Sequence, residues 1–163
     1  MSAIKEWGLV MIDDRMIHGQ VMFVWMQHKK FNRIIIVDDA TAADAFMLDV
    51  LRLAAPRGLD IIAYSIKDCV NILNGLSDPQ NTMILMKTPH TAKLLYEAGV
   101  IYDALNIGGI GSGPGRKNVF KNTAISPAEY GVLMDLHQKG VSITFLSVPG
   151  EKSKNFSDIK SIK

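Results

Sequence analysis

One histidine in the chain has neighbours suited to phosphoryl transfer. His18 lies in the string from Ile12 to Val21 and follows Asp13, Asp14 and Arg15 closely. A neutral imidazole is a nucleophile near pH 7, because its ordinary pKa lies at about 6.5. The planar guanidinium of Arg15 matches the oxygens of a phosphoryl group. These residue types in this order favour a histidine that accepts a phosphoryl group beside a cation that holds it.

The acids and the following segment would supply the remaining help. We expect Asp13 or Asp14 to orient either Arg15 or the ring of His18. The N–H groups around Gly19 to Val21 open a helix and can donate to phosphoryl oxygens, helped by the helix dipole. The residues alone leave a second interpretation open, in which the acids and Arg15 form an ordinary surface ion pair and His18 lies in an unreactive turn.

Alternating strands and helices would position this string. A helix is expected over residues 18–29, and Thr41 is expected to cap the next one. Strands are predicted at residues 8–12, 34–37, 61–64, 83–86, 104–107 and 141–148. Further helices are predicted at residues 42–55, 66–73, 89–98 and 126–140, the last with Ser126, Pro127 and Glu129 as its start signal. Residues 119–125 are expected to form a short irregular strand or ribbon.

Repeated strand–helix units of this length imply a mostly parallel sheet with helices on both faces. We therefore expect an α/β fold, a single three-layer αβα domain over residues 1–163, with a basic, solvated C-terminal tail at residues 152–163. Ligands of such folds bind outside the carboxyl ends of the strands. Three segments fall there: residues 13–18, 38–41 and 108–117.

Composition excludes several functions for the 163-residue chain. Apolar residues make up 48% and the net charge is only +2, which gives no footprint of nucleic-acid binding. The single cysteine, Cys69, cannot form a disulfide or a zinc site and is expected to be buried in a protein of the reducing cytoplasm. No metal ligand set and no membrane-spanning apolar run is apparent.

The glycine-rich stretch from Gly108 to Lys117 does not fit a known phosphate-binding motif. Arg116 separates Gly115 from Lys117 and no Ser or Thr follows, so the Walker pattern fails. The spacing of its glycines also fails the dinucleotide-binding pattern. A nucleotide-dependent enzyme is therefore disfavoured, and we expect a flexible loop near the active edge.

The string around His18 resembles the signature of IIB components of the mannose/sorbose family of the sugar phosphotransferase system (PTS). That signature reads Ile-Asp-Asp/Ser-Arg-Leu-Ile-His-Gly-Gln-Val, followed by a Trp. This chain matches it with Met16 in place of Leu and with Trp25 downstream. The likeness continues at residues 33–39, 54–58, 105–109, 115–117 and 126–148.

The resemblance implies a specific activity. His18 would accept a phosphoryl group on Nδ1 from a phosphohistidine of a IIA partner and pass it to a sugar taken up through the membrane components IIC and IID. Arg15 would stabilise the phosphate. From the residues themselves, we expect Asp14 to be the third catalytic residue beside His18 and Arg15. The resemblance implies no metal and no organic cofactor, and a cytoplasmic protein peripherally associated with the transporter.

Two positions depart from the family pattern. Met11 stands where the family often has an Arg, and Met47 replaces a second Arg near the phosphate. Lys87, Arg116 and Lys117 are candidates to replace that cation, because each follows a strand end.

The departure at Met47 keeps an alternative function open. The chain would then be a non-catalytic α/β module that binds a phosphorylated metabolite or a partner protein. The sugar cannot be read from the chain, although Val148 to Glu151 resembles N-acetylgalactosamine-type members. A homodimer also stays open, because Trp25 and the methionines suit an interface as well as a core.

Overall fold

A seven-stranded sheet forms the centre of the computed structural model, which describes residues 6–162. Its strand order is β3-β2-β4-β1-β5-β8-β9, and all pairs are parallel except β8 with β9. The strands are β1 (Leu9–Asp13), β2 (Arg33–Val37), β3 (Asp60–Tyr64), β4 (Thr82–Met86), β5 (Ala104–Gly109), β8 (Ser142–Phe145) and β9 (Lys154–Asn155). A separate hairpin pairs β6 (Lys117–Phe120) with β7 (Thr123–Ile125).

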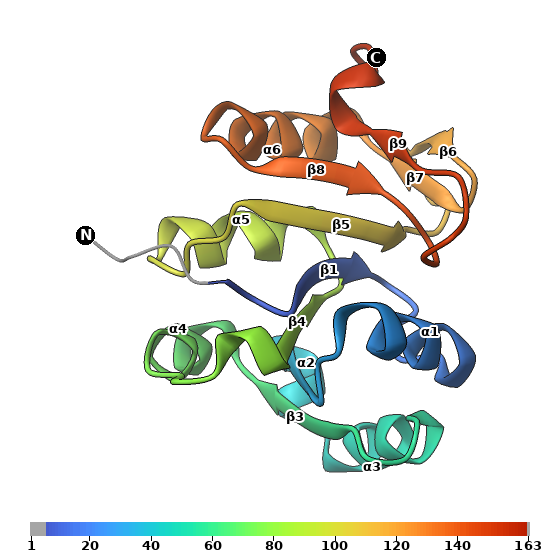
Figure 1. The fold of residues 1–163 in the computed structure, drawn as a ribbon. Coiled ribbons are helices and arrows are strands. Elements are labelled where there is room, and N and C mark those ends of the chain that lie inside the picture. Colours follow the sequence, from blue (N-terminus) through green and yellow to red (C-terminus); the bar gives the residue numbers. More distant parts are fainter. Residues whose placement is uncertain (1–5, 163) are drawn as a thin grey trace.

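Helices cover both faces of the sheet (Figure 1). The α-helices are α1 (Gly19–Lys29), α2 (Asp39–Ala42), α3 (Ala45–Ala54), α4 (Ile66–Asn74), α5 (Pro89–Glu97) and α6 (Pro127–Gln138). Short 3₁₀ turns occur at η1 (Pro79–Asn81) and η2 (Phe156–Asp158). Buried residues of α4, α5 and α6 pack on one face, and those of α1 and α3 pack on the other. The predicted α/β fold with helices on both faces is therefore confirmed.

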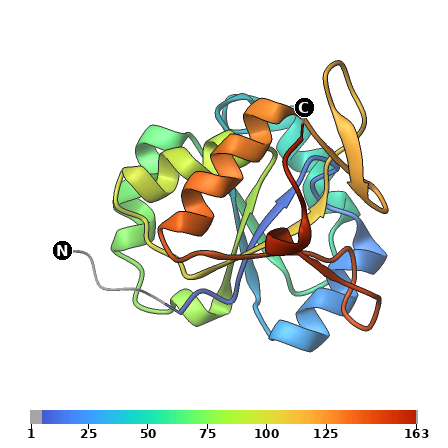
Figure 2. The ribbon, with the colours of Figure 1, turned by 90° about the horizontal axis from the view of Figure 1, so that it is seen from above.

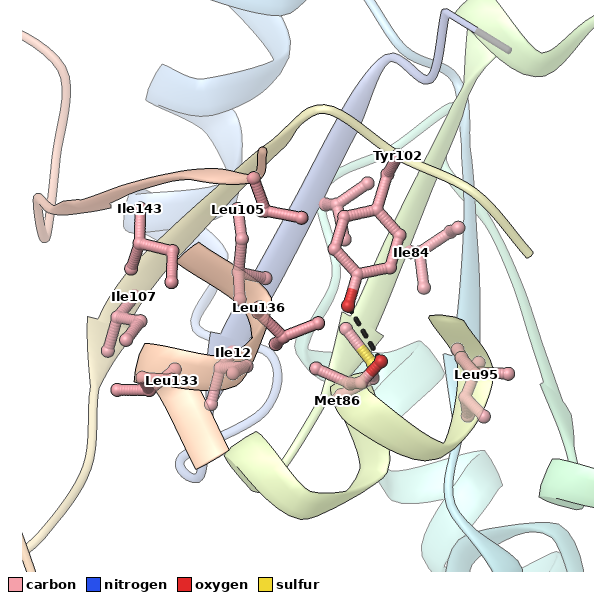
Figure 3. Packing of buried hydrophobic residues seen from close by; sticks show 14 of the residues in the cluster. Ile12, Ile84, Met86, Leu95, Tyr102, Leu105, Ile107, Leu133, Leu136 and Ile143 are labelled. Atoms are coloured by element: carbon pink, nitrogen blue, oxygen red, sulfur yellow. Dashed lines mark hydrogen bonds between the residues drawn. The ribbon is translucent and has the colours of Figure 1, made fainter. Parts of the chain in front are cut away.

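The central strands are apolar because both of their sides are covered. Every residue of β1 and β4 is buried, which matches the continuous hydrophobic runs of strands that lie between two helical layers. Figure 3 shows the core beneath α5 and α6, where Leu95, Leu133 and Leu136 meet the strands. Within it, the hydroxyl of Tyr102 donates to the carbonyl of Ala92 at 2.6 Å, so its polar end is satisfied.

The only cysteine lies in this core, as expected. Cys69, on α4, is fully buried. Burial, followed by the charge of nearby Asp68, raises the pKa of its thiol to about 12. A thiol in this state is inert at neutral pH.

The helix predicted at residues 42–55 is wrong in its start. Two helices occupy this region: Asp38 caps α2 by accepting from the N–H of Thr41, and Asp44 caps α3 by accepting from the N–H of Met47. Thr41 is therefore not the cap but a buried residue whose hydroxyl donates to Asp38 at 2.7 Å. The two aspartates offer stronger caps than a threonine, and they divide the segment.

The C-terminal segment is more ordered than the solvated tail expected from its charge. Residues 154–155 form β9, which pairs antiparallel with β8. The side chain of Phe156 is 1% exposed and packs against Phe145 and Tyr130. Figure 2 shows this segment returning across the end of the molecule beside α6. One buried aromatic ring thus anchors a stretch that its lysines alone would leave in solvent.

Candidate active site

Asp13 organises a tight turn at the carboxyl end of β1. The residue is 1% exposed, and its Oδ1 accepts from the backbone N–H of Arg15 at 3.0 Å, which is an Asx turn. The N–H of Met16 closes the turn on the carbonyl of Asp13. Met16 has a φ of 67° while its side chain is buried. A left-handed backbone is strained for this residue type, so the burial and the turn hydrogen bonds hold it in place.

The same carboxylate fixes the guanidinium of Arg15. Nε donates to Oδ1 of Asp13 at 3.0 Å and Nη2 donates to Oδ2 at 2.9 Å, a bidentate pair. The hydrogen bond with Asp13 raises the pKa of Arg15; partial burial opposes this rise, and attraction to Asp13 and Asp14 adds to it. The side chain of Arg15 is 41% exposed. A permanent positive charge is therefore held in one orientation with open access for an anion.

His18 lies at the start of α1, two residues after this turn. Its backbone is extended (φ −121°, ψ 119°), it occupies the N-cap position, and its side chain makes no capping hydrogen bond. The side chain is half-buried. No acid lies in the first turn of α1, and the first N–H groups of a helix have no partner within it. An anion beside His18 would therefore meet free donors and the positive end of the helix dipole.

The glycines at the end of β5 allow this turn to pack closely. A Cβ on Gly108 would lie 2.8 Å from Oδ2 of Asp13, and one on Gly109 would lie 3.3 Å from Nε of Arg15. Gly108 and Gly109 are part of β5, and Ile110 bridges to Thr123 of the hairpin. Of the loop predicted from Gly108 onward, the residues up to Ile110 are therefore paired, and the flexibility of the rest stays a prediction. These glycines serve close packing against the Asp13 turn.

Two polar residues beside the glycines were not found from the sequence. Asn122 Nδ2 donates to the carbonyl of Gly108 at 3.2 Å, and Ser147 Oγ donates to the same carbonyl at 3.1 Å. Ser147 also lies 2.8 Å from Oδ1 of Asn122. The carbonyl of Ser147 accepts from Nε1 of Trp25 on α1. Only their position after strand ends could have indicated Asn122 and Ser147, because no motif contains them.

Asp14 holds the glycine loop and not the guanidinium. Its Oδ2 accepts from the N–H of Gly111 at 2.7 Å. Of the two acids left open by the sequence, Asp13 is the one that orients Arg15. Asp14 lies near enough to Arg15 for its charge to help raise the pKa of that guanidinium.

Two of the three cations suggested as replacements at Met47 are already engaged. Lys87 lies 3.4 Å from Oδ2 of Asp38. Arg116 forms a bidentate pair with Glu129 and donates to the carbonyl of Gly111. Lys117 opens β6 and is exposed.

A fourth cation lies beside the start of α1. Arg57 is exposed and lines a hollow together with Gly19 and Gln20. Among the interactions of residues 6–162, none engages its side chain in a hydrogen bond or ion pair. Met47 itself is 43% exposed on α3.

Residues 6–162 contain no group of three or more His, Cys, Asp or Glu side chains placed to hold a metal ion. Over the same residues, no helix is long and apolar enough to cross a membrane. The groups that the structure offers at the end of β1 and the start of α1 are an imidazole, a clamped guanidinium and backbone N–H donors.

Comparison with known proteins identifies the family to which this site belongs. The family described as "PTS system sorbose subfamily IIB component" matches residues 7–163. The PTS system sorbose-specific EIIB component of Klebsiella pneumoniae is 32% identical over 151 residues, covering 92% of each chain. The N-acetylgalactosamine-specific IIB component 1 of Escherichia coli K12 is 26% identical and covers 92% of this chain and 96% of that protein.

Solved structures agree. The crystal structure of the IIBSor domain of the Klebsiella pneumoniae sorbose permease has a TM-score of 0.86 at 32% identity, covering 94% of this chain and 95% of the other. The chain belongs to the sorbose subfamily of PTS IIB components. It is thus a component of a sugar phosphotransferase system, and the family expected from the His18 string is confirmed.

Proposed function

We propose that this protein is the phosphocarrier of its transport system and that His18 carries the phosphoryl group. His18 accepts the group from a phosphohistidine of a IIA partner and passes it to a sugar bound by the membrane components IIC and IID. The observation that supports this most directly is the placement of a clamped Arg15 and the open first turn of α1 on either side of His18.

The transfer needs positioning more than acid–base catalysis. The lone pair of Nδ1 of His18 forms a bond to phosphorus while the bond from phosphorus to the donor imidazole breaks, and the electron pair of that bond returns to the donor nitrogen. When the donor ring carries a proton on its other nitrogen, it leaves as neutral imidazole and the His18 ring keeps its own Nε2 proton, so no proton has to move in this step. The charge on the phosphoryl oxygens is met by Arg15 and by the N–H groups that open α1.

The acids act through other groups. Asp13 keeps Arg15 in place, and Asp14 keeps the glycine loop close to the turn. We also propose that the protein works in the cytoplasm at the transporter, as a single domain over residues 1–163. A similar protein, the mannose-specific EIIAB component of Escherichia coli, is 27% identical over 155 residues. Its name joins a IIA part with a IIB part, and this association supports a IIA protein as the donor.

A labelling experiment tests the proposal. The protein is incubated with radiolabelled phosphoenolpyruvate, the general PTS phosphotransferases and a cognate IIA. We expect one acid-labile phosphoryl group in the unmodified protein and none in His18→Ala. Absence of label in the unmodified protein with a proven cognate IIA would refute the carrier role.

The role of Arg15 is tested in the same assay. Arg15→Ala should slow labelling by about a hundredfold while the circular dichroism spectrum stays unchanged, because an oriented charge on the phosphoryl group is lost. Arg15→Lys serves as a control for charge without the bidentate geometry and should recover part of the rate. Labelling of Arg15→Ala at the unmodified rate would show that Arg15 does not clamp the phosphate.

A further inference from the structure

Exposed apolar side chains are concentrated on two neighbouring helices. Of the seven large hydrophobic side chains exposed in residues 6–162, six belong to α1 and α3. Leu53 is 87% exposed, Phe46 78% and Phe23 54%. An exposed patch of several large apolar side chains marks an interaction site, whereas singly scattered ones need no explanation. We call these six residues the α1/α3 face: Phe23, Val24, Phe46, Met47, Val50 and Leu53.

The outer side of α3 has no partner within the described chain. Phe46, Val50 and Leu53 recur at spacings of four and three, so they form one stripe along the helix. Leu51 lies on the other side of α3 and is buried against the sheet. An ordinary surface helix has one apolar side. This helix has two, and the core uses only one.

The α1/α3 face reaches the proposed phosphoryl site. A hollow is lined by Gly19, Gln20 and Phe23 of α1, by Ala54 at the end of α3, and by Arg57 in the segment that follows α3. A Cβ on Gly19 would lie 2.9 Å from the carbonyl of Ala54, so the two helix ends nearly touch. Because Gly19 directly follows His18, a protein seated in this hollow lies beside His18.

Charge indicates which partner fits. The exposed Arg57 lines the hollow together with Gly19, and the half-exposed Arg15 stands three residues before His18 in the chain. Before transfer, a phosphorylated IIA brings a dianionic group to these cations. The membrane components bring a neutral sugar to a phosphoryl group that already lies on His18. Complementary charge therefore favours the donor.

We propose that the α1/α3 face is the docking surface for the phosphorylated IIA partner, an inference that rests on the proposed carrier function. A second copy of the chain fits less well, because it would cover Gly19 and Gln20 and block access to His18. A lipid surface also fits less well, because Asp44 caps α3 and Asp49 lies on it among the apolar residues, where Asp49 is 72% exposed.

Transfer kinetics test this surface. The change is the double substitution Phe46→Ser and Leu53→Ser, which removes apolar area without altering charge. We expect the KM for phosphorylated IIA to rise at least about tenfold with little change in kcat, because apolar anchors at the centre of an interface dominate its affinity. The matched control is Leu94→Ser: Leu94 is 40% exposed on α5, on the opposite face of the sheet, and its substitution should leave KM unchanged.

Two further measurements separate the outcomes. Labelling of His18 by the small donor phosphoramidate should be equal in the unmodified protein and the double variant, which shows that the site is intact. Amide chemical shifts of the unmodified protein should move on α1 and α3 when IIA is added, and not on α5 and α6. An unchanged KM, or shifts confined to α5 and α6, overturns the docking surface.

Failure of the carrier function itself would look different, because the unmodified protein would then remain unlabelled by IIA. Normal transfer from IIA with lost transfer to sugar in membrane vesicles would assign the face to the membrane components and overturn the proposal. A dimer that the double variant abolishes, with transfer from IIA unchanged, would assign the face to a second copy and overturn it as well.

Discussion

The two faces of the central sheet are covered to different extents. On one face α4, α5 and α6 stand side by side and bury their apolar residues, and Leu94 is the single large hydrophobic side chain there that is exposed among residues 6–162. On the other face α1 and α3 carry six exposed ones. A cavity of about 280 Å³ also remains open beside α1, lined by Trp25, Asn106 and Thr144 among others.

Because of this difference, we expect residues that stabilise the fold and residues that contact a partner to be concentrated on different faces. The face covered by α4, α5 and α6 places most of its apolar area where water is excluded, which is the main favourable term in folding. The face of α1 and α3 leaves apolar area in water beside His18, at a cost in solubility that a binding partner would remove. A substitution of a buried residue on the first face should therefore affect stability, and a substitution of an exposed residue on the second should affect partner contact.

The largest expected effect comes from removing a buried side chain on the face that α4, α5 and α6 cover. Leu136→Ala, on α6, should lower the free energy of unfolding by about 2–5 kcal/mol, because Leu136 is fully buried. Leu53→Ala on α3 should change it by less than about 0.5 kcal/mol. Urea denaturation of both variants measures the contrast. Comparable losses in the two variants would show that the faces do not differ in this way.

Two glycine substitutions sharpen the comparison. Gly19→Ala should cost about 1–3 kcal/mol and slow labelling of His18, because the new Cβ would lie 2.9 Å from the carbonyl of Ala54. Gly131→Ala on α6 should raise stability by about 0.4–1 kcal/mol without affecting labelling, because nothing lies within 4 Å of its new Cβ. Thermal unfolding and the labelling assay measure both effects. A neutral Gly19→Ala would mean that the start of α1 tolerates displacement.

The smallest expected effect is a pH dependence at the start of α6. Burial acts to raise the pKa of Glu129, but hydrogen bonds from Arg116 and Ser126 outweigh it, so the pKa lies below the ordinary 4.5. The folded state then binds this proton less readily than the unfolded state, and its stabilisation is lost as pH falls through the acidic range. Stability measured against pH should fall less steeply there in Glu129→Gln. Equal slopes in both proteins would contradict the assignment.

Much of the fold could be predicted because its strands are uniformly apolar. Ile34, Ile35 and Ile36 are buried on alternate sides of the sheet, and such a run is typical of a strand between two helical layers. The capping box of Ser126 and Glu129 is present as predicted. The predicted start of α3 is wrong because Asp38 and Asp44 each cap a helix of their own. The spacing of apolar residues alone does not show that the segment is divided into two helices. The order of the C-terminal segment depends on Phe156 finding Phe145, a contact distant in sequence.

The candidate site was predictable only where it forms a motif. His18 and Arg15 stand in one string, so their proximity follows from the chain. Asn122, Ser147 and Arg57 come from three other segments, and only the three-dimensional structure brings them to this edge. The choice between Asp13 and Asp14 was likewise undecided, since either acid could reach Arg15 and the buried one does.

The left-handed backbone of Met16 has a consequence for how fast the protein can react. Its buried side chain and the Asp13 turn hold the backbone after Arg15 in one conformation before any partner arrives. The free energy that this strained backbone costs is offset when the protein folds, so the cost does not recur each time His18 reacts. In the proposed transfer, this turn would therefore add no rearrangement of its own to the time that each phosphoryl exchange takes.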